Sequence, residues 1–118
     1  MSELWGVTLS GDDVVVARLT GEIDLSNASD IADQLGAGVP NSALGLVVDL
    51  TATSYLDSSG VHLLFDLGER LTRRQQQLYV VVPMDAPIRR VLRIVNLGDS
   101  VPLMATVEEA EASIRANA

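Results

Sequence analysis

The hydrophobic pattern of the chain is most regular over residues 44–71. Residues 44–50 form an apolar run with β-branched residues at its centre, which is typical of a strand covered on both faces. Over residues 59–73, apolar side chains recur at helical spacing, and a polar stripe lies opposite them. The apolar positions are Val61, Leu64, Phe65, Gly68 and Leu71, and the polar positions are His62, Asp66, Glu69, Arg70 and Arg73. The pattern predicts a buried central strand, a polar turn over residues 51–56 and an amphipathic helix packed on the strand.

The N-terminal segment has the alternation of a hairpin. Apolar and polar residues alternate over residues 5–10, and a second apolar run follows over residues 14–20 after a Gly-Asp-Asp turn. Residues 21–24 are expected to leave the second strand. Ser26 is then expected to cap a short helix that ends at Gly36. The predicted inner face of this helix consists of Ala28, Ile31, Ala32 and Leu35.

Strands and helices also alternate after the central helix. A strand is predicted over residues 78–82, and Pro102 marks residues 101–104 as a short edge strand. Between them, Asp85 is expected to cap a helix that begins with a proline. Thr106 has the capping-box spacing of a last helix. The inward positions are predicted to be Ile88, Val91, Leu92 and Val95 in the first of these helices and Val107, Ala110 and Ile114 in the second, with Arg89, Arg90 and Arg93 facing outward.

This order of elements predicts one α/β domain over residues 1–118, with a core of about residues 5–115. Strands separated by helices need crossover connections, so the sheet is expected to be mostly parallel. The N-terminal hairpin adds an antiparallel edge, and about four helices are expected to cover the sheet.

Composition narrows the possible functions. The 118 residues are 47% hydrophobic but only 3% aromatic, so the core is expected to be aliphatic. The absence of cysteine excludes disulfides and thiolate metal sites. The net charge of −8 argues against a nucleic-acid partner. Neither a signal peptide nor a membrane-spanning apolar stretch is evident, so a cytoplasmic protein with no membrane partner is expected.

Two kinds of enzyme can be tested directly against the sequence, and both are disfavoured. Ser58, His62 and Asp66 are spaced four residues apart and share one helix face. A serine hydrolase also needs an oxyanion hole and a positioned nucleophile elbow, and no G-x-S-x-G motif is present. A nucleotide-binding site lacks both the Walker loop and the G-x-G-x-x-G motif.

A carboxylate metal site is a third hypothesis. Asp24, Asp49 and Asp57 each follow or end a predicted strand, so they can gather at one edge of the sheet and bind Mg²⁺. One histidine and no cysteine disfavour a transition metal. The simpler explanation for Asp49 and Asp57 is that their carboxylates satisfy N–H groups in the loops.

The serine pair Ser58-Ser59 at the start of the central helix has two interpretations. The first N–H groups of a helix lack intrahelical partners, and Ser and Asp are ordinary N-cap residues, so helix physics alone favours a cap. A serine at this place is also a good phosphorylation site, and the acidic turn before it is a good surface for a protein partner. The residues alone leave both interpretations open.

Three segments resemble the STAS domain, in particular the bacterial anti-sigma-factor antagonists. They are Gly21-Glu22-Ile23-Asp24, Val47-Val48-Asp49-Leu50 and Leu56-Asp57-Ser58-Ser59-Gly60. The order of elements matches from Val7 to Ile114. The resemblance implies a STAS-like fold and a regulatory protein that is not an enzyme and carries no cofactor or metal.

In that family, the serine directly after the motif aspartate is phosphorylated, which implies that Ser58 is the acceptor and Ser59 a neighbour. The kinase is an anti-sigma factor with a histidine-kinase-like ATPase fold. The resemblance implies that the unphosphorylated protein binds this anti-sigma factor and releases its sigma factor. Phosphorylation breaks the complex, and a metal-dependent serine phosphatase restores it.

The resemblance and the predicted topology together place a partner-binding surface around Ser58. Its predicted residues are Asp24, Ser26, Asp57, Ser58, Ser59, Gly60, His62 and Asp66. His62 departs from the family pattern, since many relatives carry glycine there. The protein is expected to be a monomer or a weak dimer. The alternative function is a STAS scaffold module that binds another protein without phosphorylation.

Overall fold

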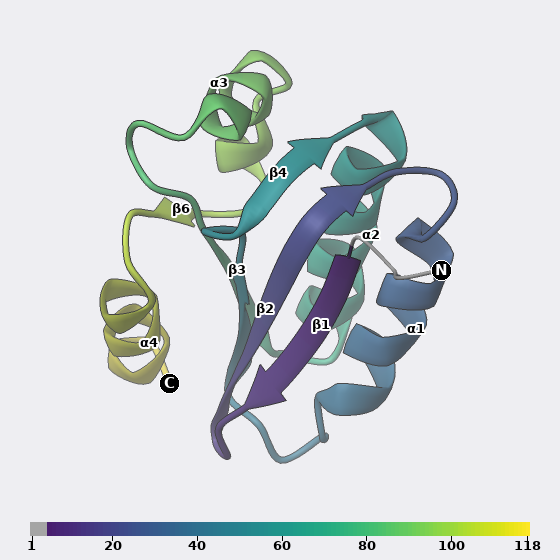
Figure 1. Cartoon of the computed structure of the whole chain (residues 1–118). Helices are drawn as coiled ribbons and strands as arrows, with labels where there is room; N and C mark the ends of the chain where they lie inside the picture. The colour runs from purple at the N-terminus through teal and green to yellow at the C-terminus, as the bar shows by residue number, and fades with distance from the viewer. Residues whose placement is uncertain (1–4) are drawn as a thin grey trace.

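The chain folds around a mixed six-stranded sheet with helices on both faces (Figure 1). The computed structural model describes residues 5–118, and most of the segment on which the signal-peptide expectation rests lies outside them. The strands are β1 (Trp5–Ser10), β2 (Val14–Ile23), β3 (Gly45–Asp49), β4 (Thr53–Leu56), β5 (Gln77–Val81) and β6 (Leu103–Met104). The helices are α1 (Ala28–Gly38), α2 (Ser58–Arg73), α3 (Pro87–Ile94) and α4 (Val107–Ala116), with a 3-10 turn at Leu97–Asp99.

The sheet has the order β1-β2-β3-β5-β6, and β4 pairs with β2 beyond the end of β3. β1 runs antiparallel to β2, whereas β3, β4, β5 and β6 run parallel to their neighbours. β3 is buried along its whole length between β2 and β5. The predicted α/β class, the antiparallel N-terminal edge and the central apolar strand are therefore confirmed.

The prediction for the segment before α2 was wrong. Residues 51–56 were expected to form a turn, but β4 begins at Thr53, and residues 21–23 continue β2 instead of leaving it. The Thr53 hydroxyl donates a hydrogen bond of 2.8 Å to the carbonyl of Leu19, which anchors the new strand to β2. The sequence gives little sign of β4, because the strand has four residues and only the first and last are buried, which is not the alternation of a typical strand. As a result, the sheet extends as far as the start of α2.

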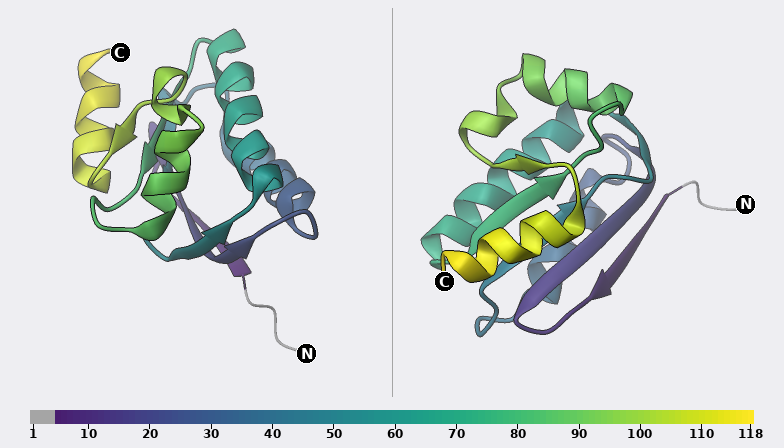
Figure 2. Two further views of the ribbon diagram at one scale, coloured as in Figure 1. Left: turned by 90° about the horizontal axis from the view of Figure 1, so that it is seen from above. Right: turned by 90° about the vertical axis from the view of Figure 1, so that its left-hand side faces the viewer.

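The helices form two layers (Figures 1 and 2). α1 and α2 cover one face of the sheet over the larger apolar cluster, and α4 covers part of the other face over a smaller one. The inner face of α2 is wider than predicted, because Leu63 and Leu67 are buried as well. Phe65 is only half-buried against the cluster. In α3, Ile88 and Leu92 are buried as predicted, but Val91 and Val95 are each 39% exposed and were wrongly placed inward.

Two predicted helix caps are also corrected. The N-cap position of α1 is occupied by Asn27 and not by Ser26, and the Asn27 side chain makes no capping hydrogen bond. It instead accepts the Asp24 N–H and donates to the Glu22 carbonyl, which holds the loop in place. The N-cap position of α3 is occupied by Ala86, and the Asp85 side chain does not cap that helix. None of the helices within residues 5–118 is both long enough and apolar enough to span a bilayer.

Candidate functional site

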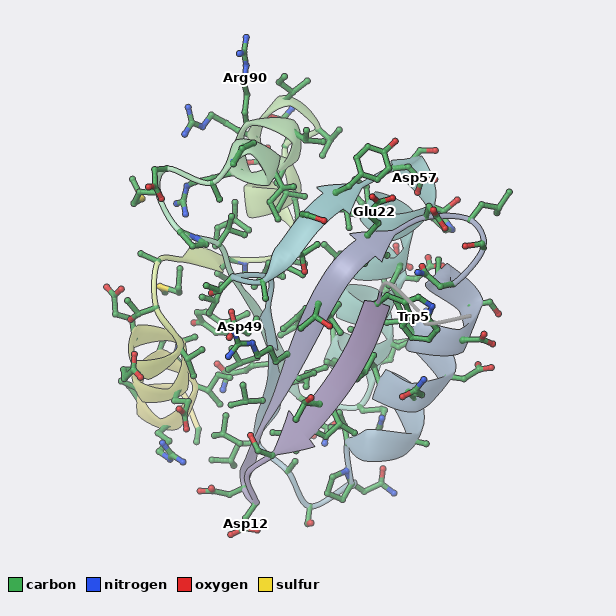
Figure 3. All side chains as sticks on the ribbon, viewed as in Figure 1. Trp5, Asp12, Glu22, Asp49, Asp57 and Arg90 are labelled. Atoms are coloured by element: carbon green, nitrogen blue, oxygen red, sulfur yellow. The ribbon has the colours of Figure 1, made fainter. Side chains whose placement is uncertain are left out.

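Two loops meet at the end of the sheet where β2 and β4 finish side by side. Ile23 and Leu56 are paired at these strand ends, and the chain continues from them into the loop before α1 and into Asp57. The Asp57 N–H donates to the Ile23 carbonyl at 3.2 Å, and the Leu25 N–H donates to the Asp57 carboxylate at 3.2 Å. Figure 3 shows Asp57 at this end of the molecule and Asp12 at the opposite end. The loop before α1 and the start of α2 therefore form one connected surface.

Asp57 is the N-cap of α2. One of its carboxylate oxygens accepts hydrogen bonds from the N–H groups of Ser59 at 2.8 Å and Gly60 at 3.1 Å, while the other accepts from Leu25. These contacts satisfy N–H donors that have no helical partner. The cap interpretation of the serine pair thus applies to the preceding aspartate.

Ser58 is the first residue of α2, and it is exposed. Within residues 5–118, no hydrogen bond engages the hydroxyl of Ser58 or that of Ser59. The two serines differ in exposure, because Ser59 is half-buried and its N–H is held by Asp57. The first turn of α2 carries no acidic side chain. Ser58 consequently presents a free hydroxyl on a helix end that is already capped.

Gly60 was predicted to belong to a partner-binding surface, but it is buried in the first turn of α2. A Cβ atom at this position would lie 2.5 Å from Leu56 Cδ1 and 3.2 Å from Ile23 Cγ2. The absence of a side chain therefore lets the first turn of α2 approach the ends of β2 and β4. The contribution of Gly60 to the site is close packing.

A groove of about 820 Å³ runs between α1 and α2 from this end. The walls from the α1 side are Leu25, Ala28, Ser29 and Ala32. The walls from α2 are Ser58, Ser59, His62, Leu63, Asp66, Leu67, Glu69, Arg70 and Arg73. The groove brings together Ser58, His62 and Asp66, which were predicted to share one helix face. Asp24 and Ser26 were predicted on the same surface, but they are not among the residues that line the groove.

His62 and Asp66 form an exposed pair, with 3.0 Å between His62 Nε2 and Asp66 Oδ2. Their side chains are 75% and 57% exposed, respectively. Within the described chain, no hydrogen bond joins Ser58 to His62, so the residues do not form the relay of a serine hydrolase. Sequence spacing placed them on one face correctly, but their chemistry is that of a solvated surface.

The three aspartates considered for a metal site do not gather. Asp49 is buried at the end of β3, and it accepts hydrogen bonds from the N–H and the hydroxyl of Thr51. It lies away from the ends of β2 and β4, because β4 extends the sheet beyond β3. Asp24 accepts from the N–H of Ser26 at 2.9 Å and from its hydroxyl. Among residues 5–118 there is no group of three or more His, Cys, Asp or Glu side chains that fits a metal ion. The Asp24 and Asp49 carboxylates are bound within their own loops, whereas Asp57 caps α2 and also accepts the Leu25 N–H.

Two exposed apolar side chains at the site were missed by the sequence interpretation. Leu25 is 80% exposed and lines the groove between Asp24 and Ser26. Tyr55 of β4 is 50% exposed, opposite Glu22 of β2. For Leu25, the available signal was a lone leucine in a polar loop, outside any periodic pattern. Large apolar side chains exposed beside polar ones are common anchors of protein interfaces.

Comparisons with known proteins identify the family. RsfB, an anti-sigma-F factor antagonist of Mycobacterium tuberculosis, is 29% identical over 102 residues that cover 86% of this chain and 82% of RsfB. The crystal structure of an anti-sigma factor antagonist from Mycobacterium paratuberculosis superposes with a TM-score of 0.83 at 30% identity and covers 94% of each chain.

The anti-sigma factor antagonist SpoIIAA shares the fold in two states. Its unphosphorylated form has a TM-score of 0.76 at 24% identity and covers 95% of this chain and 96% of SpoIIAA. Its phosphorylated form has a TM-score of 0.66 at 24% identity and covers 93% of this chain and 98% of SpoIIAA. The model of the STAS domain matches residues 8–110. The chain belongs to the STAS domain family.

Proposed function

We propose that this protein is an anti-sigma factor antagonist that is switched by phosphorylation of Ser58. The observation that carries the proposal is the free, exposed Ser58 hydroxyl on a helix that Asp57 already caps. A hydroxyl that is not needed for folding is available to a kinase. The names of RsfB and of the Mycobacterium paratuberculosis protein support the antagonist role.

The partner is proposed to be an anti-sigma factor with a histidine-kinase-like ATPase fold, which docks over the end of the sheet. The docking surface consists of Asp24, Leu25, Ser26, Ser58, Ser59, His62 and Asp66, with Asp57 and Gly60 holding it from below. Leu25 supplies an apolar anchor and the carboxylates supply an acidic rim. In this role the protein is a substrate and a switch, with no catalytic site of its own.

The fold is expected to tolerate a phosphate on Ser58. A phosphoserine adds about −1.5 to −2 charges at neutral pH, and its position at a helix N-terminus gains ~0.3–1 kcal/mol from the helix dipole. SpoIIAA, which shares the fold, has been solved in a phosphorylated form. We therefore expect the phosphate to act without unfolding the domain.

The phosphate is instead expected to break the complex. Two unit charges about 5 Å apart repel by roughly 3 kcal/mol at an effective dielectric of ~20, before screening by salt. The new charge lies beside Asp57 in a surface that the partner must cover and desolvate. Loss of one buried complementary contact commonly costs ~2–5 kcal/mol of binding. A metal-dependent serine phosphatase is proposed to restore the binding form.

Isothermal titration against the kinase-type anti-sigma factor of the source organism tests this function. The unphosphorylated protein is expected to bind and to release the sigma factor, and the protein phosphorylated at Ser58 is expected to bind at least about 30-fold more weakly. Equal binding of both forms contradicts the switch and favours a scaffold module. No binding of either form contradicts the antagonist role.

A further inference from the structure

The pair formed by His62 and Asp66 lies directly beside the proposed phosphorylation site. His62 is the single histidine of the chain, and its Nε2 lies 3.0 Å from Asp66 Oδ2. Both side chains are largely exposed, and exposed ion pairs at this spacing contribute little to stability. The packing of α2 does not require either side chain, so stability does not account for the pair.

Helix geometry places this pair on the same face as Ser58. Residues four apart on a helix are neighbours, and Ser58, His62 and Asp66 follow this spacing along α2. His62 contacts Asp66 through Nε2, so Nδ1 is the ring nitrogen left for a group on Ser58. All three residues line the same groove. A phosphate on Ser58 is thus one helical turn from the imidazole.

The charges around the groove make His62 the natural cation for that phosphate. The charged residues that line the groove all come from α2, and they are Asp66, Glu69, Arg70 and Arg73. The lining residues on the α1 side are uncharged, and they are Leu25, Ala28, Ser29 and Ala32. Asp57 and Asp24 lie at the end where Ser58 projects. Along the helix axis, Arg70 is about 18 Å from Ser58 at ~1.5 Å per residue. The arginines of the groove are consequently too distant to neutralise the phosphate.

We propose that protonated His62, held by Asp66, binds the phosphate carried by Ser58. Both ring nitrogens of an imidazole are donors only in the protonated form, so the imidazolium has one N–H for Asp66 and one for the phosphate. The inference rests on the proposed phosphorylation and makes the stability of the phosphorylated form depend on the protonation of His62. The phosphorylated state gains stability from the contact as the pH falls, and loses that gain as the pH rises and His62 releases its proton.

Phosphoserine incorporated genetically at position 58 tests this contact without any kinase. The gain in melting temperature caused by the phosphate is expected to be at least about 3 °C larger at pH 6.5 than at pH 8.5. In NMR spectra the imidazole signals belong to one residue, and the pH at which they shift is expected to rise on phosphorylation. An unchanged imidazole titration, or a melting gain that is equal at both pH values, overturns the proposal.

Three variants separate the contact from a general charge effect. His62→Gln is expected to reduce the pH dependence of the melting gain to the part that comes from the second ionisation of the phosphate itself, because glutamine cannot gain a proton. His62→Arg is expected to keep the gain at both pH values, because arginine stays charged. Glu69→Gln changes a charge in the same groove and is expected to leave the pH dependence intact. A pH dependence of wild-type size in His62→Gln overturns the assignment.

These measurements need no anti-sigma factor, so the phosphate contact and the proposed function can fail separately. Suppose that phosphorylation changes the His62 titration as expected but does not change binding to the anti-sigma factor. This result would contradict the proposed function and support the phosphate contact. Suppose instead that phosphorylation abolishes binding but His62→Gln keeps the wild-type pH dependence of the melting gain. This result would contradict the phosphate contact and support the proposed function.

Discussion

The N-termini of α2 and α4 are capped by different residues. At α4, the Thr106 hydroxyl accepts the N–H of Glu109 at 3.2 Å and also donates to the Glu109 carboxylate, so the cap consumes the hydroxyl. At α2, the Asp57 carboxylate is the cap, and the hydroxyl of the next residue stays free. The first turn of α4 also carries Glu108 and Glu109, whereas that of α2 carries no acid.

This difference shows how a helix end becomes available for modification. When the cap is the residue before the serine, the serine can change its charge without removing a hydrogen bond that holds the helix. The end of α4 offers neither a free hydroxyl nor an environment that accepts a phosphate. The two ends therefore provide matched positions at which the proposed switch can be tested.

The largest expected effect is a difference in binding between the two ends. Ser58→Asp is expected to weaken the complex with the anti-sigma factor by ~2–5 kcal/mol, because it adds charge within the docking surface. Thr106→Asp adds the same charge, keeps a favoured N-cap residue and is expected to bind normally. Isothermal titration measures both affinities, and circular dichroism checks that both variants are folded. Equal losses of affinity would mean that total charge, and not the site, controls binding.

Core substitutions under the two helices are expected to have similar costs. Leu64 of α2 and Ile114 of α4 are both essentially inaccessible to solvent. Replacing either by Ala is expected to lower the free energy of unfolding by ~2–5 kcal/mol, since each change leaves a cavity. Chemical denaturation measures the loss. A stability unchanged by Leu64→Ala would show that the inner face of α2 is assigned wrongly.

Removal of the caps is expected to have a smaller effect on stability. Thr106→Ala and Asp57→Ala are each expected to cost ~0.5–2 kcal/mol, with Asp57→Ala at the upper end because its carboxylate also binds the Leu25 N–H. Hydrogen exchange is expected to show faster exchange of the Leu25 amide in Asp57→Ala alone. Unchanged exchange at Leu25 would separate the loop before α1 from the start of α2.

The smallest expected effect concerns charge at the rim of the surface. Asp66→Lys reverses a charge in the groove, and Glu111→Lys reverses one on α4, where Glu111 pairs with Arg115 at 3.6 Å. Asp66→Lys is expected to slow association with the anti-sigma factor several-fold, and Glu111→Lys is expected to have little effect. Stopped-flow kinetics measures both rates. If both variants slow association equally, the proposed docking face loses its support.

Much of the fold is predictable because its signals are periodic. The buried run at β3 and the amphipathic pattern of α2 specify the central strand and its helix, and the capping-box spacing at Thr106 correctly marks the start of α4. β4 escaped prediction because its pairing with β2 depends on a contact between distant segments, such as that of the Thr53 hydroxyl with Leu19.

The arrangement of the site is less predictable for a related reason. Local sequence places Asp57, Ser58 and Ser59 at a helix start, but it does not decide which of them caps the helix. That assignment depends on the approach of Leu25 from the loop before α1 and on the burial of Gly60 against Leu56. The three-aspartate site failed in the same way, because β4 separates Asp49 from the end of the sheet.

The central claim is that Ser58 accepts the phosphate, and tandem mass spectrometry tests it most directly. The wild-type protein, Ser58→Ala and Ser59→Ala are each incubated with the kinase-type anti-sigma factor and ATP. We expect a single phosphate on Ser58 in the wild type, the same phosphate in Ser59→Ala, and none in Ser58→Ala. Phosphorylation of Ser58→Ala at the wild-type level would place the acceptor elsewhere and contradict the account.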